Sequence, residues 1–282
     1  MESLKSAVAR VVALTLVASG AAAYAFDIIT LEVPGATSTF AYNINPRGDI
    51  VGSYEANGVR HGFIFQDGTF TTIDPAGSTG TQAVGVNSRG DVVGIYETGS
   101  PDLHHGFSLQ RGVYASIDVP GARVTGAEGI NSQGEIVGFH ETGGIRHAFL
   151  LRRGTFTSFD FPGAASTVAN GINPQGDIVG GYSFGGVEHG FLLRDGVLSS
   201  IDVPGATWTE ARTINSEGDI VGTYEAGGLR HGFLLRDGTF TTIDVPDAAW
   251  TMVTSINPQG DVVGGYLSGG TFRGFRTRPA SP

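Results

Sequence analysis

The sequence contains no cysteine and only one lysine, Lys5. Without cysteine the chain has no disulfide, no thiol nucleophile and no thiolate metal ligand. With lysine confined to position 5, Schiff-base catalysis and P-loop phosphate binding both lack the residue that they require. No apolar run reaches the ~20 residues that a membrane-spanning helix needs. We therefore expect no cofactor and no membrane span.

Positive charge is also scarce, since the formal net charge is −10. A nucleic-acid-binding protein needs clustered lysine and arginine to neutralise phosphates, so we expect no nucleic-acid partner. The same charge favours a neutral or cationic ligand over a polyanion. Hydrophobic residues make up 40% of the chain, which is enough for a sizeable core. These values are typical of a folded domain.

Residues 1–25 have the pattern of a secretory signal peptide. Lys5 and Arg10 form a positive start, an apolar stretch follows, and Ala23-Tyr24-Ala25 fits the cleavage pattern Ala-x-Ala. We predict export to the periplasm or the exterior, cleavage after Ala25, and a single mature domain over residues 26–282. The alternative is an uncleaved membrane anchor.

From Phe26 onward one motif is repeated six times. It is centred on the asparagine of Ile/Val-Asn-x-x-Gly-Asp/Glu, and successive copies are 42, 44, 42, 42 and 42 residues apart. A fixed period of this length indicates a repeat architecture. The six anchor asparagines are Asn45, Asn87, Asn131, Asn173, Asn215 and Asn257.

Each repeat contains the signals of four short strands. Asn215 to Gly218 suits a type I turn, Glu225 to Gly228 is expected to be a loop, and Asp237-Gly238 is a strong hairpin signal. Four short antiparallel strands without a helical period are typical of a propeller blade. In this copy the strands are predicted over residues 209–215, 219–224, 229–236 and 239–245.

The two ends of the repeat region supply complementary parts of one unit. Asp27 to Pro34 resembles a fourth strand without its first three, and residues 251–276 resemble the first three strands without a fourth. Joining them completes a sixth blade and leaves no sheet edge open in the ring. We predict an all-β, six-bladed β-propeller of ~42-residue four-stranded repeats, closed by the N-terminal strand and monomeric. Another closed β-repeat arrangement is the alternative.

Residues Arg146-His147-Ala148-Phe149-Leu150, after Gly129-Ile130-Asn131-Ser132-Gln133-Gly134-Glu135-Ile136-Val137-Gly138, resemble the bacterial extracellular HAF-repeat family. The resemblance covers nearly the whole predicted mature chain. It implies an exported repeat domain and no established activity. Four other copies read His-Gly-Phe, beginning at His61, His105, His189 and His231, and the last reads Arg273-Gly274-Phe275.

One interpretation of the recurring histidines is a metal cluster, but the expected ring geometry disfavours it. Third-strand residues of neighbouring blades lie more than ~10 Å apart, whereas zinc ligands lie ~2.0–2.1 Å from the metal. The Asn-x-x-Gly-Asp turns also lack the ligand pattern of a calcium loop, so we expect no metal. His104 and His140 stand outside the repeat pattern. The other histidines are expected to bond the aspartates after the fourth strand: Asp74, Asp118, Asp160, Asp202 and Asp244.

Some positions of the repeat are fixed and others vary. The sixth residue before each anchor asparagine is always threonine, whereas the third is Tyr42, Val84, Glu128, Asn170, Arg212 or Thr254. Since the first strand of a blade is innermost, we expect the variable side chains near the channel mouth, where propellers commonly hold ligands. Glu128, Asn170 and Arg212 would then form a polar arc on three consecutive blades.

Trp208 and Trp250, the only tryptophans, precede the fixed threonine in neighbouring copies. A partly exposed pair beside the polar arc suits stacking on a sugar; alternatively the two rings fill the gaps between blades. We predict an exported, non-catalytic module that binds a carbohydrate or a protein. The alternative is a propeller hydrolase or lyase, with Glu128 as general base or metal ligand, Asn170 orienting and Arg212 stabilising an anion. The candidate ligand-binding residues are Tyr42, Glu128, Asn170, Trp208, Glu210, Arg212 and Trp250.

Overall fold

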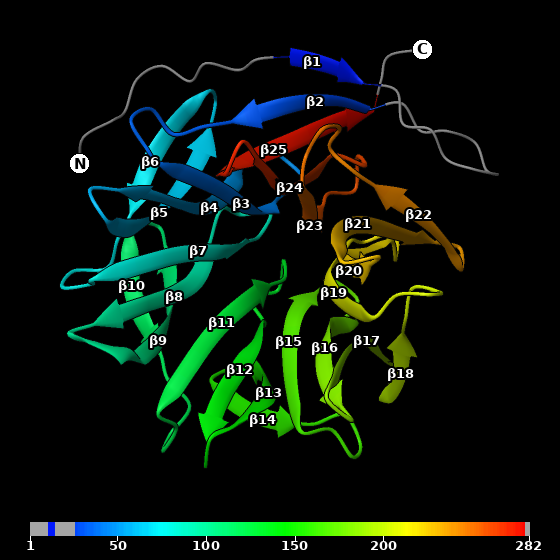
Figure 1. The fold of residues 1–282 in the computed structure, drawn as a ribbon. Helices are drawn as coiled ribbons and strands as arrows, with labels where there is room; N and C mark the ends of the chain where they lie inside the picture. The colour runs from blue at the N-terminus through cyan, green and yellow to red at the C-terminus, as the bar shows by residue number, and fades with distance from the viewer. Residues whose placement is uncertain (1–10, 15–25, 280–282) are drawn as a thin grey trace.

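The computed structural model describes residues 11–14 and 26–279. Their strands form six antiparallel sheets arranged in a ring (Figure 1), so the predicted six-bladed β-propeller is confirmed. In five blades the strands follow one another from the axis outward in chain order, with the first strand innermost. In the sixth blade the N-terminal strand lies on the outer side of the three C-terminal strands.

Blade 1 comprises β3 (Ser38–Ile44), β4 (Ile50–Ala56), β5 (Val59–Gln66) and β6 (Thr69–Ile73). Blade 2 comprises β7 (Gly80–Val86), β8 (Val92–Thr98), β9 (Ser100–Gln110) and β10 (Val113–Ile117). Blade 3 comprises β11 (Val124–Ile130), β12 (Ile136–Thr142), β13 (Ile145–Arg152) and β14 (Thr155–Phe159). Blade 4 comprises β15 (Ser166–Ile172), β16 (Ile178–Phe184), β17 (Val187–Arg194) and β18 (Val197–Ile201). Blade 5 comprises β19 (Trp208–Ile214), β20 (Ile220–Ala226), β21 (Leu229–Arg236) and β22 (Thr239–Ile243). Blade 6 comprises β23 (Trp250–Ile256), β24 (Val262–Ser268), β25 (Thr271–Pro279) and β2 (Phe26–Leu31).

The two ends of the described ring meet in blade 6, as the sequence predicts. Strand β2 pairs with β25, from Phe26 opposite Pro279 to Leu31 opposite Gly274. Strand β1 (Val11–Leu14) pairs with the outer edge of β2 and makes this sheet five-stranded (Figure 1). The remainder of the predicted signal peptide, residues 1–10 and 15–25 with the cleavage site, lies outside the described residues.

The connection between the second and third strands is tighter than predicted. Strand β20 extends to Ala226, so only Gly227-Gly228 connects it to β21, and both glycines have positive φ (60° and 78°). Two consecutive positive φ values follow the right-handed twist of a hairpin, so two residues suffice where a loop was expected. Asp237-Gly238 forms the predicted hairpin in the same way.

A fully buried phenylalanine on the third strand forms the centre of each blade's core and packs on a glycine of the second strand. In blade 4 a Cβ atom on Gly180 would lie 2.0 Å from the carbonyl oxygen of Val168 and 2.7 Å from the Phe191 ring. Only glycine leaves room for this ring at that position. The six phenylalanines, each at most 1% exposed, are Phe63, Phe107, Phe149, Phe191, Phe233 and Phe275.

The anchor asparagine holds its own turn and reaches the next blade. The Asn131 Oδ1 atom accepts hydrogen bonds from the backbone N–H groups of Gln133 and Glu135. Its Nδ2 atom donates to the Glu135 carboxylate at 2.9 Å and to the carbonyl oxygen of Asn173 at 3.2 Å. The turn and the contact between blades therefore depend on one buried side chain.

Each acidic residue of these turns is paired with an arginine of the same blade, but the arginine comes from two sources. In blades 1 and 2 it lies in the turn itself, as in the pair Arg47–Asp49 at 2.6 Å. In the other blades it lies on the third strand, as in the pair Arg236–Asp219 at 2.7 Å. The remaining pairs are Arg89–Asp91, Arg152–Glu135, Arg194–Asp177 and Arg276–Asp261.

The predicted histidine–aspartate pairs are confirmed in five blades, with Nδ1 to carboxylate distances of 2.8–2.9 Å. Each histidine ring also stacks on a second-strand ring, a tyrosine in four blades and His140 in blade 3. The Nε2 atom of His140 hydrogen-bonds Ser158 at 2.8 Å, just as the tyrosines bond a fourth-strand hydroxyl. His140 therefore belongs to the repeat after all, in the tyrosine position.

The fixed threonine anchors the connection between blades. In blade 5 the Thr209 Oγ1 atom accepts a hydrogen bond from the backbone N–H of Val203 at 3.2 Å. Proline replaces that residue in the second copy, as Pro75, and has no N–H to donate. Thr81 donates to Ser78 Oγ instead, at 3.2 Å.

Candidate functional site

Every innermost strand has a β-bulge, and the bulged residue is the third before the anchor asparagine. These residues include Tyr42 of blade 1, Glu128 of blade 3 and Arg212 of blade 5, and the charges of Glu128 and Arg212 act on the Tyr42 hydroxyl group. The sequence interpretation placed these residues at the start of the strand, near the mouth. In the structure each is the fifth of the seven residues of its strand, and therefore lies deeper in the channel than expected.

Three predicted site residues form one connected cluster. The Arg212 Nη2 atom lies 2.8 Å from Glu210 Oε2, and the Asn170 Nδ2 atom donates to Glu210 Oε1 at 3.0 Å. Asn170 also donates to the carbonyl oxygen of Ala211 at 2.9 Å, across the boundary between blades 4 and 5. The Glu210 carboxylate therefore neutralises Arg212 and fixes the Asn170 amide.

Glu128 differs from these neighbours, because no hydrogen bond or ion pair from the described residues reaches its carboxyl group. Burial raises its pKa to about 7, opposed by the positive charge of Arg212 and reinforced by the negative charge of Glu210. Arg146 opposes the rise to a smaller extent. The carboxyl group of Glu128 can therefore donate or accept a hydrogen bond near neutral pH.

Tyr42 lies in the channel wall formed by blades 1 and 2. Its hydroxyl group donates to Gln82 Oε1 at 3.2 Å and accepts from Ser53 Oγ at 3.3 Å, and burial raises its pKa. Gln82 is the fifth residue before its anchor asparagine, another position that varies between copies. Sequence reasoning did not select Gln82 or Ser53, although the variation at the position of Gln82 was a usable signal.

The two tryptophans flank an arginine that sequence reasoning missed. The Arg230 Cζ atom lies 5.5 Å from the Trp208 ring centroid and 5.2 Å from the Trp250 centroid. Arg230 occupies a face of each ring, so the pair is not the open stacking platform that the sequence suggested. The signal was present, because the residue before the recurring histidine varies: Arg60, His104, Arg146, Glu188, Arg230 and, in the last copy, Phe272.

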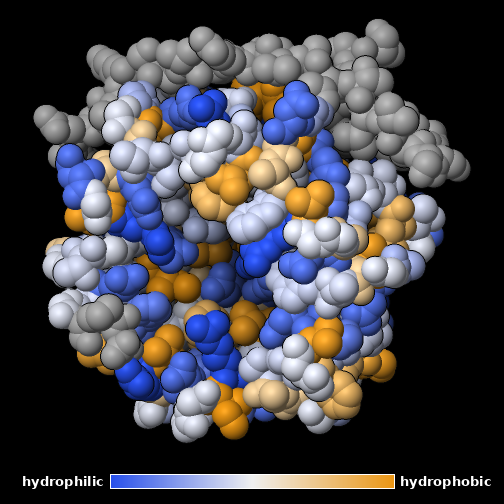
Figure 2. Space-filling view, in the orientation of Figure 1, coloured by the Kyte–Doolittle hydropathy of each residue, from blue (hydrophilic) through white to orange (hydrophobic). Residues whose placement is uncertain are grey.

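On the face shown in Figure 2 the centre of the ring is hollowed, with hydrophilic residues gathered in the hollow and hydrophobic residues around it. Because the strands of a blade alternate in direction, the second-to-third-strand hairpins share one face of the ring with the start of the first strand. Trp208, Trp250 and Arg230 lie at that end of their strands. We call this end of the channel the hairpin end.

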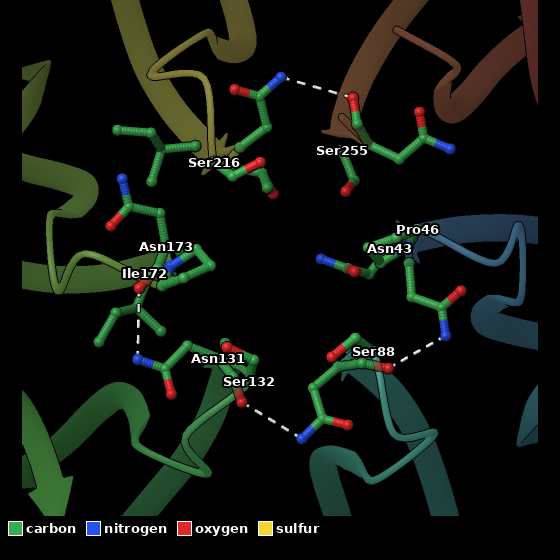
Figure 3. Close-up of a pocket in the computed structure, with 18 of the residues that line it drawn as sticks. Asn43, Pro46, Ser88, Asn131, Ser132, Ile172, Asn173, Ser216 and Ser255 are labelled. Carbon is green, nitrogen blue, oxygen red and sulfur yellow. Dashed lines mark hydrogen bonds between the residues drawn. The ribbon is translucent and has the colours of Figure 1, made fainter. Parts of the chain in front are cut away.

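A second cavity lies where the first strands end and the anchor turns begin, and we call it the turn cavity (Figure 3). It has a volume of about 260 Å³, and none of its lining residues is charged. Its wall contains Ile172 and the equivalent aliphatic residues, and the residue after each anchor asparagine, a proline such as Pro46 or a serine such as Ser88, forms its rim. Sequence analysis did not identify this cavity, because its residues are fixed by the turn and were explained by it.

Among the described residues, no group of three or more His, Cys, Asp or Glu side chains is arranged to hold a metal ion. The same residues include no helix of the length and apolarity that crossing a membrane requires.

No protein-family model and no curated protein matches the sequence. Among solved structures, the chain is similar to the β-propeller domain of the Trilobed protease from Pyrococcus furiosus, with 13% identity and a TM-score of 0.57, over 100% of this chain and 93% of that one. It is also similar to a catalytically inactive virginiamycin B lyase from Staphylococcus aureus solved with quinupristin, with 11% identity and a TM-score of 0.53, over 89% and 99% of the two chains. Identities this low show the fold alone.

Proposed function

We propose that this protein is an exported β-propeller binding module that takes a carbohydrate into the hairpin end of its channel. The proposal rests on the channel residues, and above all on Glu128. Its carboxyl group has no hydrogen-bond or ion-pair partner among the described residues, while Glu210 beside it is bonded to both Arg212 and Asn170. The buried Nε atom of Arg212 also lacks a hydrogen-bond partner there. Polar groups without partners are available to a ligand.

The chemistry of the wall supports a sugar. A sugar hydroxyl both donates and accepts, so its best partners are groups that do the same or that occur in donor–acceptor pairs. The Tyr42 hydroxyl, the Gln82 amide and a carboxyl group with a pKa of about 7 meet this requirement around one channel. Aromatic surface at the rim, from Trp208 and Trp250, adds apolar contact area.

A hydrolase or lyase is the second candidate, and one observation favours it. A carboxyl group with a pKa of about 7 has the proton affinity of a general acid or base that works near neutral pH. Arg212 and Asn170 are less free for catalysis than the sequence suggested, because Glu210 holds both. We therefore place binding first.

The two tryptophans make the binding proposal directly testable. Both are at the hairpin end, so fluorescence excited selectively from tryptophan reports on this part of the molecule. We expect a saturable fluorescence change with at least one member of a panel of neutral and acidic oligosaccharides, confirmed by calorimetry. Glu128→Gln should weaken binding at least ~10-fold, whereas Glu217→Gln, in an exposed turn at the other end, should not. Absence of binding across the panel would contradict the proposal.

The same panel separates the two candidate functions. Product release from an oligosaccharide, with a rate that follows one ionisation near pH 7 and is lost in Glu128→Gln, would favour the enzyme. Binding without product formation would favour the module. Export, the relation to the HAF-repeat family and the monomeric state belong to the same proposal. Mass spectrometry of the secreted protein should give a mature chain that starts at Phe26.

A further inference from the structure

We infer that Arg230, held between Trp208 and Trp250, is an anchor for a carboxylate, so that the carbohydrate taken by this channel is an acidic one containing uronic acid. This inference rests on the proposed function and specifies its ligand. The juxtaposition that carries it is one guanidinium stacked on two aromatic rings from neighbouring blades.

Arg230 lacks the partner that other arginines of the ring have. The arginines that pair with the anchor-turn carboxylates, and Arg212, each lie within ion-pair distance of a carboxylate, from 2.6 to 2.9 Å in the pairs Arg47–Asp49, Arg194–Asp177 and Arg212–Glu210. No carboxylate of the described residues lies within such a distance of Arg230. Glu225 stands directly across the ladder from it, but the Glu225 carboxylate faces the Thr207 hydroxyl at 3.4 Å.

The contacts that Arg230 does make leave its hydrogen-bonding edge available. Contact between a cation and the face of an aromatic ring uses none of the N–H groups of the guanidinium. Among the described residues the one polar contact of those groups is weak, from Nη1 to the Met252 sulfur at 4.0 Å. A guanidinium flanked by two rings, with its N–H groups otherwise unused, suits two parallel hydrogen bonds to a carboxylate.

A second arginine is arranged in the same way two blades away. The Arg146 Cζ atom lies 4.7 Å from the Phe139 ring centroid, and no carboxylate of the described residues is within ion-pair distance. Arg146 and Arg230 occupy the same repeat position, immediately before the recurring histidine. Arg146 also acts on Glu128 through its charge, which ties this position to the channel. Two such cations at one mouth suit a chain that carries more than one carboxylate.

The local positive charge of Arg230 and Arg146 favours an acidic ligand, whereas the negative net charge of the whole chain favours a neutral or cationic one. At the mouth the local charge dominates. Charges more than ~8–10 Å apart are screened at physiological ionic strength, so a ligand at the mouth responds mainly to nearby groups. Sugar is favoured over an acidic peptide because the donors and acceptors of Tyr42, Gln82 and Glu128 belong to the innermost strands that line the channel.

The test uses short oligomers of galacturonate, glucuronate and mannuronate, each beside the same oligomer with its carboxyl groups reduced to hydroxymethyl groups. We expect the full-length protein to bind at least one acidic oligomer 10-fold or more tightly than its reduced form, with affinity that falls as salt rises. Arg230→Gln should abolish this preference, so that the acidic oligomer and its reduced form bind with equal affinity. Arg153→Gln, which removes the same charge from a hairpin at the opposite end, should preserve the preference.

The remaining outcomes overturn the inference, and they distinguish it from the proposed function. Equal affinity for acidic and reduced oligomers would reject the carboxylate anchor and leave carbohydrate binding in place. A preference that survives in Arg230→Gln would reject Arg230 as the anchor. Binding of oligo-glutamate but of no oligosaccharide would reject both the acidic sugar and the proposed function, as would failure to bind any member of the panel. Since Arg230→Gln alters the packing of the tryptophans, its retained affinity for the reduced oligomer is the evidence that the site is intact.

Discussion

Arg236 and Asp219 are joined by two hydrogen bonds, from Nε to Oδ1 at 2.8 Å and from Nη2 to Oδ2 at 2.7 Å. They are seventeen residues apart in sequence, on the third strand and in the anchor turn of blade 5. The Arg236 hydrogen bonds hold the pKa of Asp219 below its usual value against the opposing effect of burial, and Asn215 adds to them. The charged carboxylate is therefore part of the folded blade.

Asp219→Asn is expected to destabilise the protein by about 1–3 kcal/mol near pH 7. Because the pKa is lower in the folded state, the unfolded chain binds the proton more tightly. The contribution is therefore present above the unfolded pKa and lost as pH falls through the folded one. Urea denaturation of both proteins at pH 7 and pH 3 should show the difference shrinking in acid. Asp237→Asn, in an exposed hairpin, is the control and should have no such effect.

Glu128→Gln is expected to have the opposite pH dependence. A pKa raised from 4.5 to about 7 means that the folded protein keeps this proton after the unfolded chain has released it, so stability falls as pH rises between these values. The variant should match the wild type near pH 4 and exceed it near pH 8, by on the order of 2 kcal/mol. Equal stability of the two proteins at both pH values would show that the carboxyl group is solvated rather than buried.

Two adjacent glycines provide a matched test of blade packing. A Cβ atom on Gly180 would lie 2.0 Å from a carbonyl oxygen, whereas one on Gly181 would first meet the Glu210 Cγ atom at 3.3 Å, a side-chain contact that a shift of a few tenths of an ångström relieves. Gly180→Ala should therefore cost more than about 3 kcal/mol or prevent folding, and Gly181→Ala less than about 1 kcal/mol. Chemical denaturation measures both. Similar effects for the two variants would contradict the packing described for the second strand.

Deletion of residues 26–34 should destabilise the entire ring. It removes β2, whose Ile28 packs in the core shared by blades 5 and 6, and it removes Leu31 and Val33 from the core of blade 1. We expect the melting temperature to fall by more than ~10 °C or the cooperative transition to disappear. Truncation after Pro279 is the control and should have little effect. An unchanged transition in the deletion would contradict closure by the N-terminal strand.

Replacement of both tryptophans separates the two interpretations of the pair. Because Trp208 and Trp250 are only partly buried and flank Arg230, we expect Trp208→Ala with Trp250→Ala to remove ligand binding and lower stability modestly. Calorimetric binding and thermal denaturation, followed by circular dichroism, measure the two effects. Unfolding of the double variant would instead assign the rings to the packing between blades.

Most of the fold could be predicted from the sequence because the sequence is repetitive. Six copies of one pattern allow fixed and variable positions to be compared, so the blades, their closure and the bond from His231 to Asp244 could all be predicted. The bulge at Glu128 could not be predicted, because it depends on how β11 and β12 align in their ladder. No residue type marks such a bulge in the sequence. The depth of the site in the channel was therefore misjudged.

Contacts between blades account for the other omissions. Arg230 lies on the third strand of blade 5 and meets Trp250 of blade 6, so no pattern within one copy pairs them. The raised pKa of Glu128 likewise depends on burial in a channel formed by all six blades. Sequence comparison between copies identifies which positions are free to vary, but it does not show which of them meet in space.

The ion pairs of the anchor turns have a consequence for how such a ring can change over time. In blade 1 the cation is Arg47 from the turn, and in blade 5 it is Arg236 from the third strand, yet each lies in the same blade as its carboxylate. Duplication or loss of one whole unit therefore leaves no anchor-turn carboxylate without its arginine. Recombination within a unit that joins the turn of blade 5 to the third strand of blade 1 would leave the turn carboxylate without an arginine. Whole blades are thus the segments that this lineage can exchange without an electrostatic penalty.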